Sequence, residues 1–260
     1  MTPPSQHFNS NGLTPHDIES LERATVDAVA PPHTQEIDGW LLPMDHATIG
    51  RARSAVPLRH AGLDPQALRS IASAYRQWGI PARFRIADRP GLDTIQERLY
   101  EMGYTPEQPT LVQTGTVASL LALPVVGSAT VESSPSDQWA AVYTAPGFDP
   151  VDGANRVQAL SRSLYTVYAS VHRDGQALAA GTASLSQTWA SIHGMRTVPG
   201  ARGRGLASQV LRALAEAAAQ RGFKRVFLQV EENNRAALAL YARAGFATAW
   251  RYRYWRDSCC

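Results

Sequence analysis

A glycine-rich turn in the last quarter of the chain has the composition of a phosphate-binding site. It reads Arg202-Gly203-Arg204-Gly205-Leu206-Ala207 and lies between an expected strand and an expected helix. Glycines let the backbone turn tightly and leave the peptide N–H groups open to a ligand. The start of a helix adds unpaired N–H groups and the positive end of the helix dipole. The turn is therefore suited to a diphosphate, although an ordinary strand–helix connection can have the same sequence.

Two other phosphate motifs are excluded by their spacing. A Walker A loop needs GxxxxGK[ST], and the chain has no Lys-Ser or Lys-Thr pair. A dinucleotide-binding fingerprint needs GxGxxG after the first strand of its domain. Here Gly203-Arg204-Gly205 is followed by Leu206-Ala207-Ser208 and comes late in its domain.

Two side chains downstream of the turn have chemistry of their own. The phenol of Tyr241 is protonated at neutral pH and can donate a proton to a departing group. The amide of Asn234 can hold a ligand by hydrogen bonds. Each also has a structural alternative, since Asn234 is a good helix N-cap and Tyr241 can pack in the core beside Leu238 and Phe246.

Together these residues resemble the two signatures of the GCN5-related N-acetyltransferase (GNAT) superfamily. Residues 198–207 match its Arg/Gln-x-x-Gly-x-Gly/Ala motif. The second signature, Asn-x-x-Ala-x-x-Leu-Tyr-x-x-x-Gly-Phe, is matched by Asn234, Ala237, Leu240, Tyr241, Gly245 and Phe246. The resemblance covers about residues 128–256. The first half fits the same fold only in outline, as in the tandem-repeat members of the superfamily.

The resemblance implies acetyl-CoA as co-substrate, bound between two splayed neighbouring strands. Backbone groups of Met195 and Thr197 would pair with the pantetheine arm, which Asn234 would also contact. The N–H groups of residues 203–207 would hold the pyrophosphate, and Tyr241 would protonate the leaving thiolate. The implied cofactor-binding residues are Met195, Arg196, Thr197, Arg202, Gly203, Arg204, Gly205, Leu206, Ala207, Ser208, Asn234, Ala237 and Tyr241.

The attacking amine must lose a proton, and His193 is the expected catalytic base. Strand alternation places it on the same face as Met195 and Thr197, and an imidazole with a pKa near 6.5 suits proton transfer. A satisfied core or sheet-surface histidine is the alternative. The rival bases are carboxylates, each of which can instead be a plain surface group: Glu231, Glu232 and Glu132.

Hydrophobic spacing after residue 128 predicts the order β-α-β-β-β-α-β-α-β. The expected strands are 129–132, 164–173, 176–186, 188–198, 226–230 and 247–256. Helices are expected at 136–144, from Leu206 to Gly222, and at 234–244. The turn Arg173-Asp174-Gly175 predicts a hairpin between two of these strands.

The first half contains a fainter copy of the later elements. A helix at 64–77, a strand at 82–88 and a helix at 92–102 are expected there. The glycines that end matching helices have similar spacing, with 24 residues from Gly79 to Gly103 and 23 from Gly222 to Gly245. Two repeats of one fold explain this agreement, and a chance helix–strand–helix likeness is the alternative.

The first repeat lacks the features that would bind a second cofactor. Its turn, residues 57–65, keeps one glycine and places Asp64 at the expected N-cap, followed by Pro65. A carboxylate there would repel a phosphate. Leu99 stands where the second repeat has Tyr241. We therefore expect one CoA site per chain.

The predicted fold is mixed α/β (α+β type), with two tandem GNAT-like domains. Each would be a mixed, mostly antiparallel sheet flanked by helices. The expected divisions are a disordered tail (1–12), a degenerate GNAT-like domain (13–119), a linker (120–128) and a catalytic domain (129–260).

Composition narrows the partners. The net charge is +3 with basic residues spread along the chain, which argues against nucleic acid. No apolar run approaches the roughly 18 residues of a membrane span, and the first residues lack the features of a secretion signal. The two cysteines, Cys259 and Cys260, form no metal-type spacing. A cytoplasmic monomer or homodimer without metal is expected.

The leading functional hypothesis is transfer of an acetyl group to a primary amine, on a small molecule or a peptide, by direct attack in a ternary complex. The alternatives are a longer acyl donor, a protein lysine or N-terminal acetyltransferase, and a non-catalytic acyl-CoA-binding regulatory module. Four aromatic residues either line the acceptor cleft or pack in the core: Trp139, Tyr165, Tyr168 and Trp189.

Overall fold

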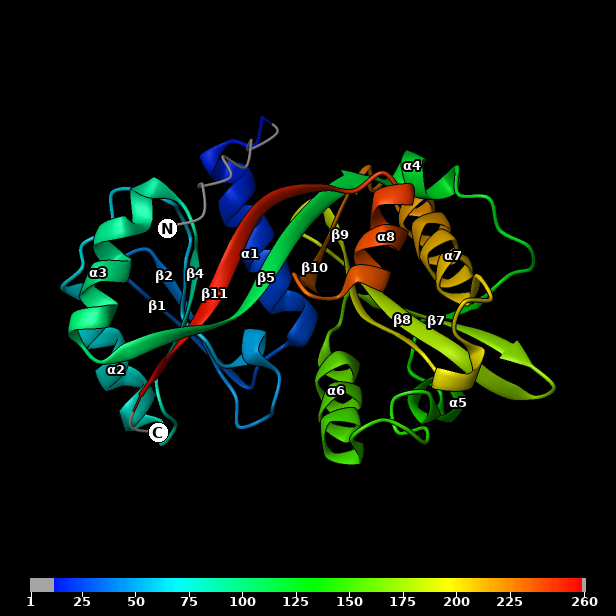
Figure 1. The fold of residues 1–260 in the computed structure, drawn as a ribbon, viewed down its shortest axis with the longest axis horizontal. Helices are drawn as coiled ribbons and strands as arrows, with labels where there is room; N and C mark the ends of the chain where they lie inside the picture. Colours follow the sequence, from blue (N-terminus) through cyan, green and yellow to red (C-terminus); the bar gives the residue numbers. More distant parts are fainter. Residues whose placement is uncertain (1–11, 259–260) are drawn as a thin grey trace.

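The computed structural model describes residues 12–258 and has a mixed α/β fold, as predicted (Figure 1). The predicted tail, apart from its last residue, and the two cysteines lie outside the described residues. An eight-stranded sheet has the order β4-β11-β5-β10-β9-β8-β7-β6, and a three-stranded sheet has the order β1-β2-β3. The strands are β1 His33–Ile37, β2 Trp40–Met44, β3 Val56–Pro57, β4 Arg83–Ala87, β5 Tyr104–Thr116, β6 Thr130–Glu132, β7 Thr166–Arg173, β8 Gln176–Ser186, β9 Trp189–Thr197, β10 Arg225–Glu231 and β11 Ala247–Asp257.

Helices cover both faces of the large sheet. They are α1 Pro15–Val29, α2 Ala67–Gln77, α3 Asp93–Glu101, α4 Val117–Leu121, α5 Asp137–Ala141, α6 Pro150–Arg162, α7 Leu206–Gln220 and α8 Arg235–Arg243, with short 3₁₀ turns η1 Gly50–Ala52, η2 Pro90–Leu92 and η3 Pro199–Ala201. Neighbouring residues of β8 show the two faces, since Ala180 packs with Trp139 and Tyr143 whereas Gly181 lies against Val210 of α7.

The two halves of the chain exchange a long strand. In the first half, β4 leads through α3 to β5, yet β11 lies between β4 and β5. In the second half, β10 leads through α8 to β11, yet β5 lies between β10 and β11. Figure 1 shows β5 and β11 side by side across the middle of the molecule. The two halves thus have the same strand–helix–strand order. In each half, the last strand is inserted next to the first strand of the other half's unit.

The exchange joins strands from both sides of the predicted linker in one sheet. The antiparallel pairing of β5 with β11 runs from Tyr104 opposite Asp257 to Thr114 opposite Ala247. Helix α1 also crosses between the halves, because it packs on β8 and β9, and Trp189 donates a hydrogen bond to Ser20 at 2.9 Å. The division at residues 120–128 stays a prediction.

Most predicted elements of the second half are present, with one omission. The predicted order lacked α6, so β6 is followed by two helices rather than one. Its signal is visible in the sequence, since Asp149 caps the helix and Pro150 is its first residue. The predicted hairpin is confirmed, with Arg173 opposite Gln176 and positive φ angles at Asp174 and Gly175.

In the first half the structure corrects one helix start. The sequence predicted a helix from Asp64, but α2 begins at Ala67. The Asp64 side chain instead accepts a hydrogen bond from the Gln66 N–H at 2.9 Å, which closes a turn before the helix. Within residues 12–258, no helix combines the length and apolar character that crossing a membrane requires.

Candidate active site

The neighbouring strands β9 and β10 separate before either strand ends. Their parallel pairing ends at Ile192 and Leu228, although β9 continues to Thr197 and β10 to Glu231. Beyond these residues the two strand ends are therefore not paired with each other. A cavity of about 350 Å³ opens beside the parting. The splayed strands implied by the resemblance are present.

A β-bulge at Gly194 lies just beyond the point where β9 stops pairing with β10. His193 pairs with Thr182 and Arg196 with Ala180, so Gly194 and Met195 together face the single residue Gly181. Gly194 has a φ of +64°, which a glycine adopts without penalty. A Cβ at this position would lie 2.7 Å from the hydroxyl of Tyr143.

The bulge corrects the predicted orientation of His193. An extra residue in a strand reverses the alternation that follows it. Met195 therefore packs toward α7, whereas His193 contacts Phe227 edge-on, on the opposite face of the sheet. The prediction that His193 shares a face with Met195 and Thr197 was wrong. The signal was available, since a glycine inside a strand often marks a bulge.

Side chains from the neighbouring loop and α6 hold the bulge in place. The hydroxyl of Tyr143 donates a hydrogen bond to the Gly194 carbonyl at 2.8 Å, and burial raises the pKa of this tyrosine. Arg196 donates to the Tyr143 carbonyl at 3.0 Å, forms an ion pair with Asp152 at 3.2 Å, and lies over the Phe148 ring. The strand end is thus fixed without help from β10.

The glycine-rich turn is exposed at the start of α7. Gly203 and Gly205 have φ angles of +76° and +74°, and no atom lies within 4 Å of a Cβ built on either. Within residues 12–258, the N–H groups of residues 203–207 donate no hydrogen bond. The side chains of Arg202 and Arg204 are exposed beside them. This is an open cradle of amides with cationic neighbours, suited to an anion.

Helix α8 brings the second motif to the cavity. Asn234, Ala237 and Tyr241 all line it. The Asn234 side chain also accepts a hydrogen bond from the Ala237 N–H at 3.1 Å, so it serves as the N-cap. Tyr241 is 7% exposed and packs edge-on against Phe246, and burial raises its pKa to about 12. Its phenol therefore keeps its proton across the neutral range.

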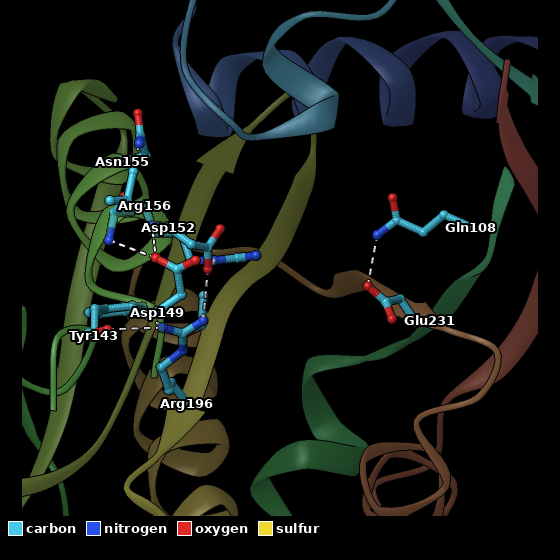
Figure 2. A network of polar contacts seen from close by, with 10 residues as sticks. Gln108, Tyr143, Asp149, Asp152, Asn155, Arg156, Arg196 and Glu231 are labelled. Carbon is cyan, nitrogen blue, oxygen red and sulfur yellow. Dashed lines mark hydrogen bonds and ion pairs between the residues drawn. The ribbon is translucent and has the colours of Figure 1, made fainter. Parts of the chain in front are cut away.

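Among the predicted bases, the cavity is lined by His193 and Glu231. Burial, and then the charge of Arg51, lower the pKa of His193 well below 6.5, and its Nε2 lies 3.0 Å from the Ser191 hydroxyl. Glu231 is exposed and accepts a hydrogen bond from Gln108 at 2.8 Å. Figure 2 shows this pair on one side and the Arg196–Asp152 cluster on the other.

The remaining predicted residues lie away from this cavity. Glu232 forms an ion pair with Arg251 at 3.3 Å, and Glu132 accepts a hydrogen bond from Ser136 at 2.6 Å. None of the four aromatic candidates lines the cavity. Three are buried in the core, namely Trp139, Tyr168 and Trp189, whereas Tyr165 is 58% exposed.

The first half supplies cavity residues that sequence reasoning missed. They come from η1, β4 and β5, and are joined by two tyrosines of β11: Arg51, Arg83, Gln108, Thr110, Tyr252 and Tyr254. Gln108 is a non-glycine residue with a φ of +52°, at a bulge where β5 passes β11. The strand exchange places β5 and β11 beside these segments, and no local pattern in the sequence predicts it.

Comparison with known proteins gives a match over nearly the whole chain. A family model described as "Probable histone acetyltransferase Rv0428c C-terminal" matches residues 15–255. A curated relative from Bacillus subtilis (strain 168), "Uncharacterized N-acetyltransferase YobR", is 26% identical over 255 residues, which cover 92% of this chain and 98% of that protein.

Solved structures show the same fold. A GCN5-related N-acetyltransferase from Kribbella flavida has a TM-score of 0.69 at 15% identity, covering 93% of this chain and 95% of that one. A tandem GNAT protein from the clavulanic acid biosynthesis pathway has a TM-score of 0.60 at 15% identity, covering 94% and 96%. With the family match, these structures confirm the predicted GNAT resemblance and the predicted acyltransferase class.

The bulge predicts a specific cost for Gly194→Ala. A positive φ costs a non-glycine residue about 1–2 kcal/mol, and the contacts with Tyr143 and Leu160 add about 1–3 kcal/mol of overpacking. Gly222→Ala is the matched control, because Gly222 has a φ of +80° and open space around it. Urea unfolding should show a clearly larger loss of stability for Gly194→Ala. Equal losses would contradict the tight packing of the bulge.

Proposed function

Because the chain belongs to the Rv0428c C-terminal family of acetyltransferases, we propose that it transfers an acetyl group from acetyl-CoA to a primary amine. The transfer is a direct attack of the amine within a ternary complex. The observation that carries the proposal is the parting of β9 from β10 beside a turn of unpaired amides, with Tyr241 lining the same cavity.

The residues present fit two parts of acetyl-CoA. The amides of residues 203–207, with Arg202 and Arg204, would hold the pyrophosphate. The unpaired strand end at Met195 and Thr197 would hold the pantetheine arm as a β-strand holds its neighbour. When bound there, acetyl-CoA supplies the activated acyl group and the leaving thiol.

Tyr241 would donate its proton to the departing thiolate. Its raised pKa keeps the phenol protonated at neutral pH, so the proton is available when the sulfur leaves. The C–S bond breaks as the new C–N bond forms, and the proton of Tyr241 goes to sulfur. A proton donor at this position favours turnover over a purely regulatory module.

Glu231 would accept the proton that the attacking amine releases. Its carboxylate lines the cavity, and Gln108 orients it by a direct hydrogen bond. His193 also lines the cavity, but its pKa is well below 6.5 and its ring is buried. Such an imidazole stays neutral, and its Nε2 already lies 3.0 Å from the Ser191 hydroxyl, whereas the Glu231 carboxylate is exposed. The proposal therefore places Glu231 ahead of His193.

The Tyr241→Phe variant tests the proton donor. Removing the hydroxyl should lower kcat by about 10²-fold or more and leave CoA affinity within about twofold, since packing against Phe246 is kept. Release of the CoA thiol across a panel of amines measures the first, and isothermal titration the second. Tyr100→Phe, which removes an exposed phenol in the first half, is the matched control. An unchanged kcat would refute the role, and CoA binding without thiol release from wild-type protein would favour a regulatory module.

The choice of base is tested by comparing Glu231→Gln with His193→Ala. Loss of the base should lower kcat about 10²–10⁴-fold, and we expect this for Glu231→Gln alone. Because His193 is neutral throughout the neutral range, removing it should leave the shape of the pH–rate profile unchanged. If instead the wild-type profile has an inflection near pH 6.5 that His193→Ala abolishes, the histidine is the base and Glu231 is not.

A further inference from the structure

Arg51 lines the cavity and has no ion-pair partner among residues 12–258. Four arginines line it: Arg51, Arg83, Arg156 and Arg196. Arg83 forms an ion pair with Glu107 at 2.5 Å. The last two share Asp152, at 2.7 and 3.2 Å. For Arg51, the part of the chain from residue 12 to 258 supplies neither an ion pair nor a hydrogen bond, and its Nε is buried without a partner.

The local structure fixes Arg51 in this place. It is the middle residue of η1, between Gly50 and the fully buried Ala52. Gly50 lies against the ring of Tyr254, where a Cβ would come within 2.7 Å of Cζ. After burial, the charge of Arg51 is the second cause that lowers the pKa of His193. The guanidinium therefore lies near the neutral imidazole on the cavity wall.

Burying a charged group without a partner is unfavourable, and an anionic ligand in the cavity would supply the missing partner of Arg51. The planar fork of an arginine matches a carboxylate in two parallel hydrogen bonds. A single uncommitted cation balances the one negative charge of a carboxylate, whereas a phosphate monoester carries close to two. The unpaired guanidinium thus favours a carboxylate ligand.

We propose that Arg51 binds a carboxylate of the acceptor, so that the substrates are amines that carry a carboxylate, such as amino acids. The inference rests on the proposed function. It also matches the charges on the cavity wall, because Glu231 offers a negative group to the amine while Arg51 offers a positive group to the carboxylate. Arg51 is then a specificity residue supplied by the first half of the chain.

The test uses the full-length protein and matched acceptor pairs. Amino acids are compared with their carboxamides as acceptors of acetyl-CoA, with release of the CoA thiol as readout, for wild type, Arg51→Gln and Arg51→Lys. Arg69→Gln removes the same charge from the exposed outer side of α2 and is the control. Succinyl-CoA in place of acetyl-CoA forms a second arm, because a dicarboxylic acyl donor would also bring a carboxylate.

Wild type should use the best amino acid at least tenfold better in kcat/KM than its carboxamide. Arg51→Gln should abolish that preference, Arg51→Lys should keep part of it, and Arg69→Gln all of it. An equal rate for acid and amide in wild type, or the same preference in Arg51→Gln, would overturn the proposal. So would an effect of Arg51→Gln confined to the choice between donors. Absence of thiol release from every amine would instead refute the proposed function.

Discussion

The bulge at Gly194 is the constraint on which the site depends. A strand in the middle of a sheet normally forms backbone hydrogen bonds with both neighbouring strands. Strand β9 pairs with β10 only as far as Ile192. Beyond that residue, pairing with β8 continues on one edge of the strand, and contacts with Tyr143 and with Asp152 of α6 fix its end. The edge of β9 that faces away from β8 is left unpaired there, beside the cavity. A cofactor arm that pairs like a strand can bind only where a strand has been left unpaired.

Because β5 and β11 are exchanged, residues of the first half line the same cavity. Because β5 lies between β10 and β11, residues near its bulge at Gln108 reach Glu231 at the end of β10. Because β11 lies beside β4, Tyr252 and Tyr254 share the cavity wall with Arg83 and Arg51. The first half therefore contributes to the wall of the cavity that is proposed to hold the acceptor.

Local signals made the turn and helix starts of the proposed cofactor side predictable from the sequence. The turn at residues 202–207, the caps of α7 and α8, and the type I′-like hairpin at Asp174-Gly175 each depend on residues that are adjacent in the chain. The proposed acceptor side depends on Arg51, Gln108 and Glu231, and it is the strand exchange that places Gln108 beside Glu231. Periodicity cannot reveal such pairing, because it reports which face of an element is buried and not which strand lies beside it. The face of His193 was predicted wrongly for a related reason, since one bulged residue reverses every position after it.

Amide hydrogen exchange measured with and without CoA tests most directly whether the parted strands and the amide turn of the second half form the one cofactor site. Bound cofactor should slow exchange at Met195 and Thr197, beyond the end of the β9–β10 pairing, and at residues 203–207, whose N–H groups donate no hydrogen bond within residues 12–258. Exchange at the first-half turn, residues 59–64, should not change. Protection at 59–64, or none at 203–207, would contradict the account.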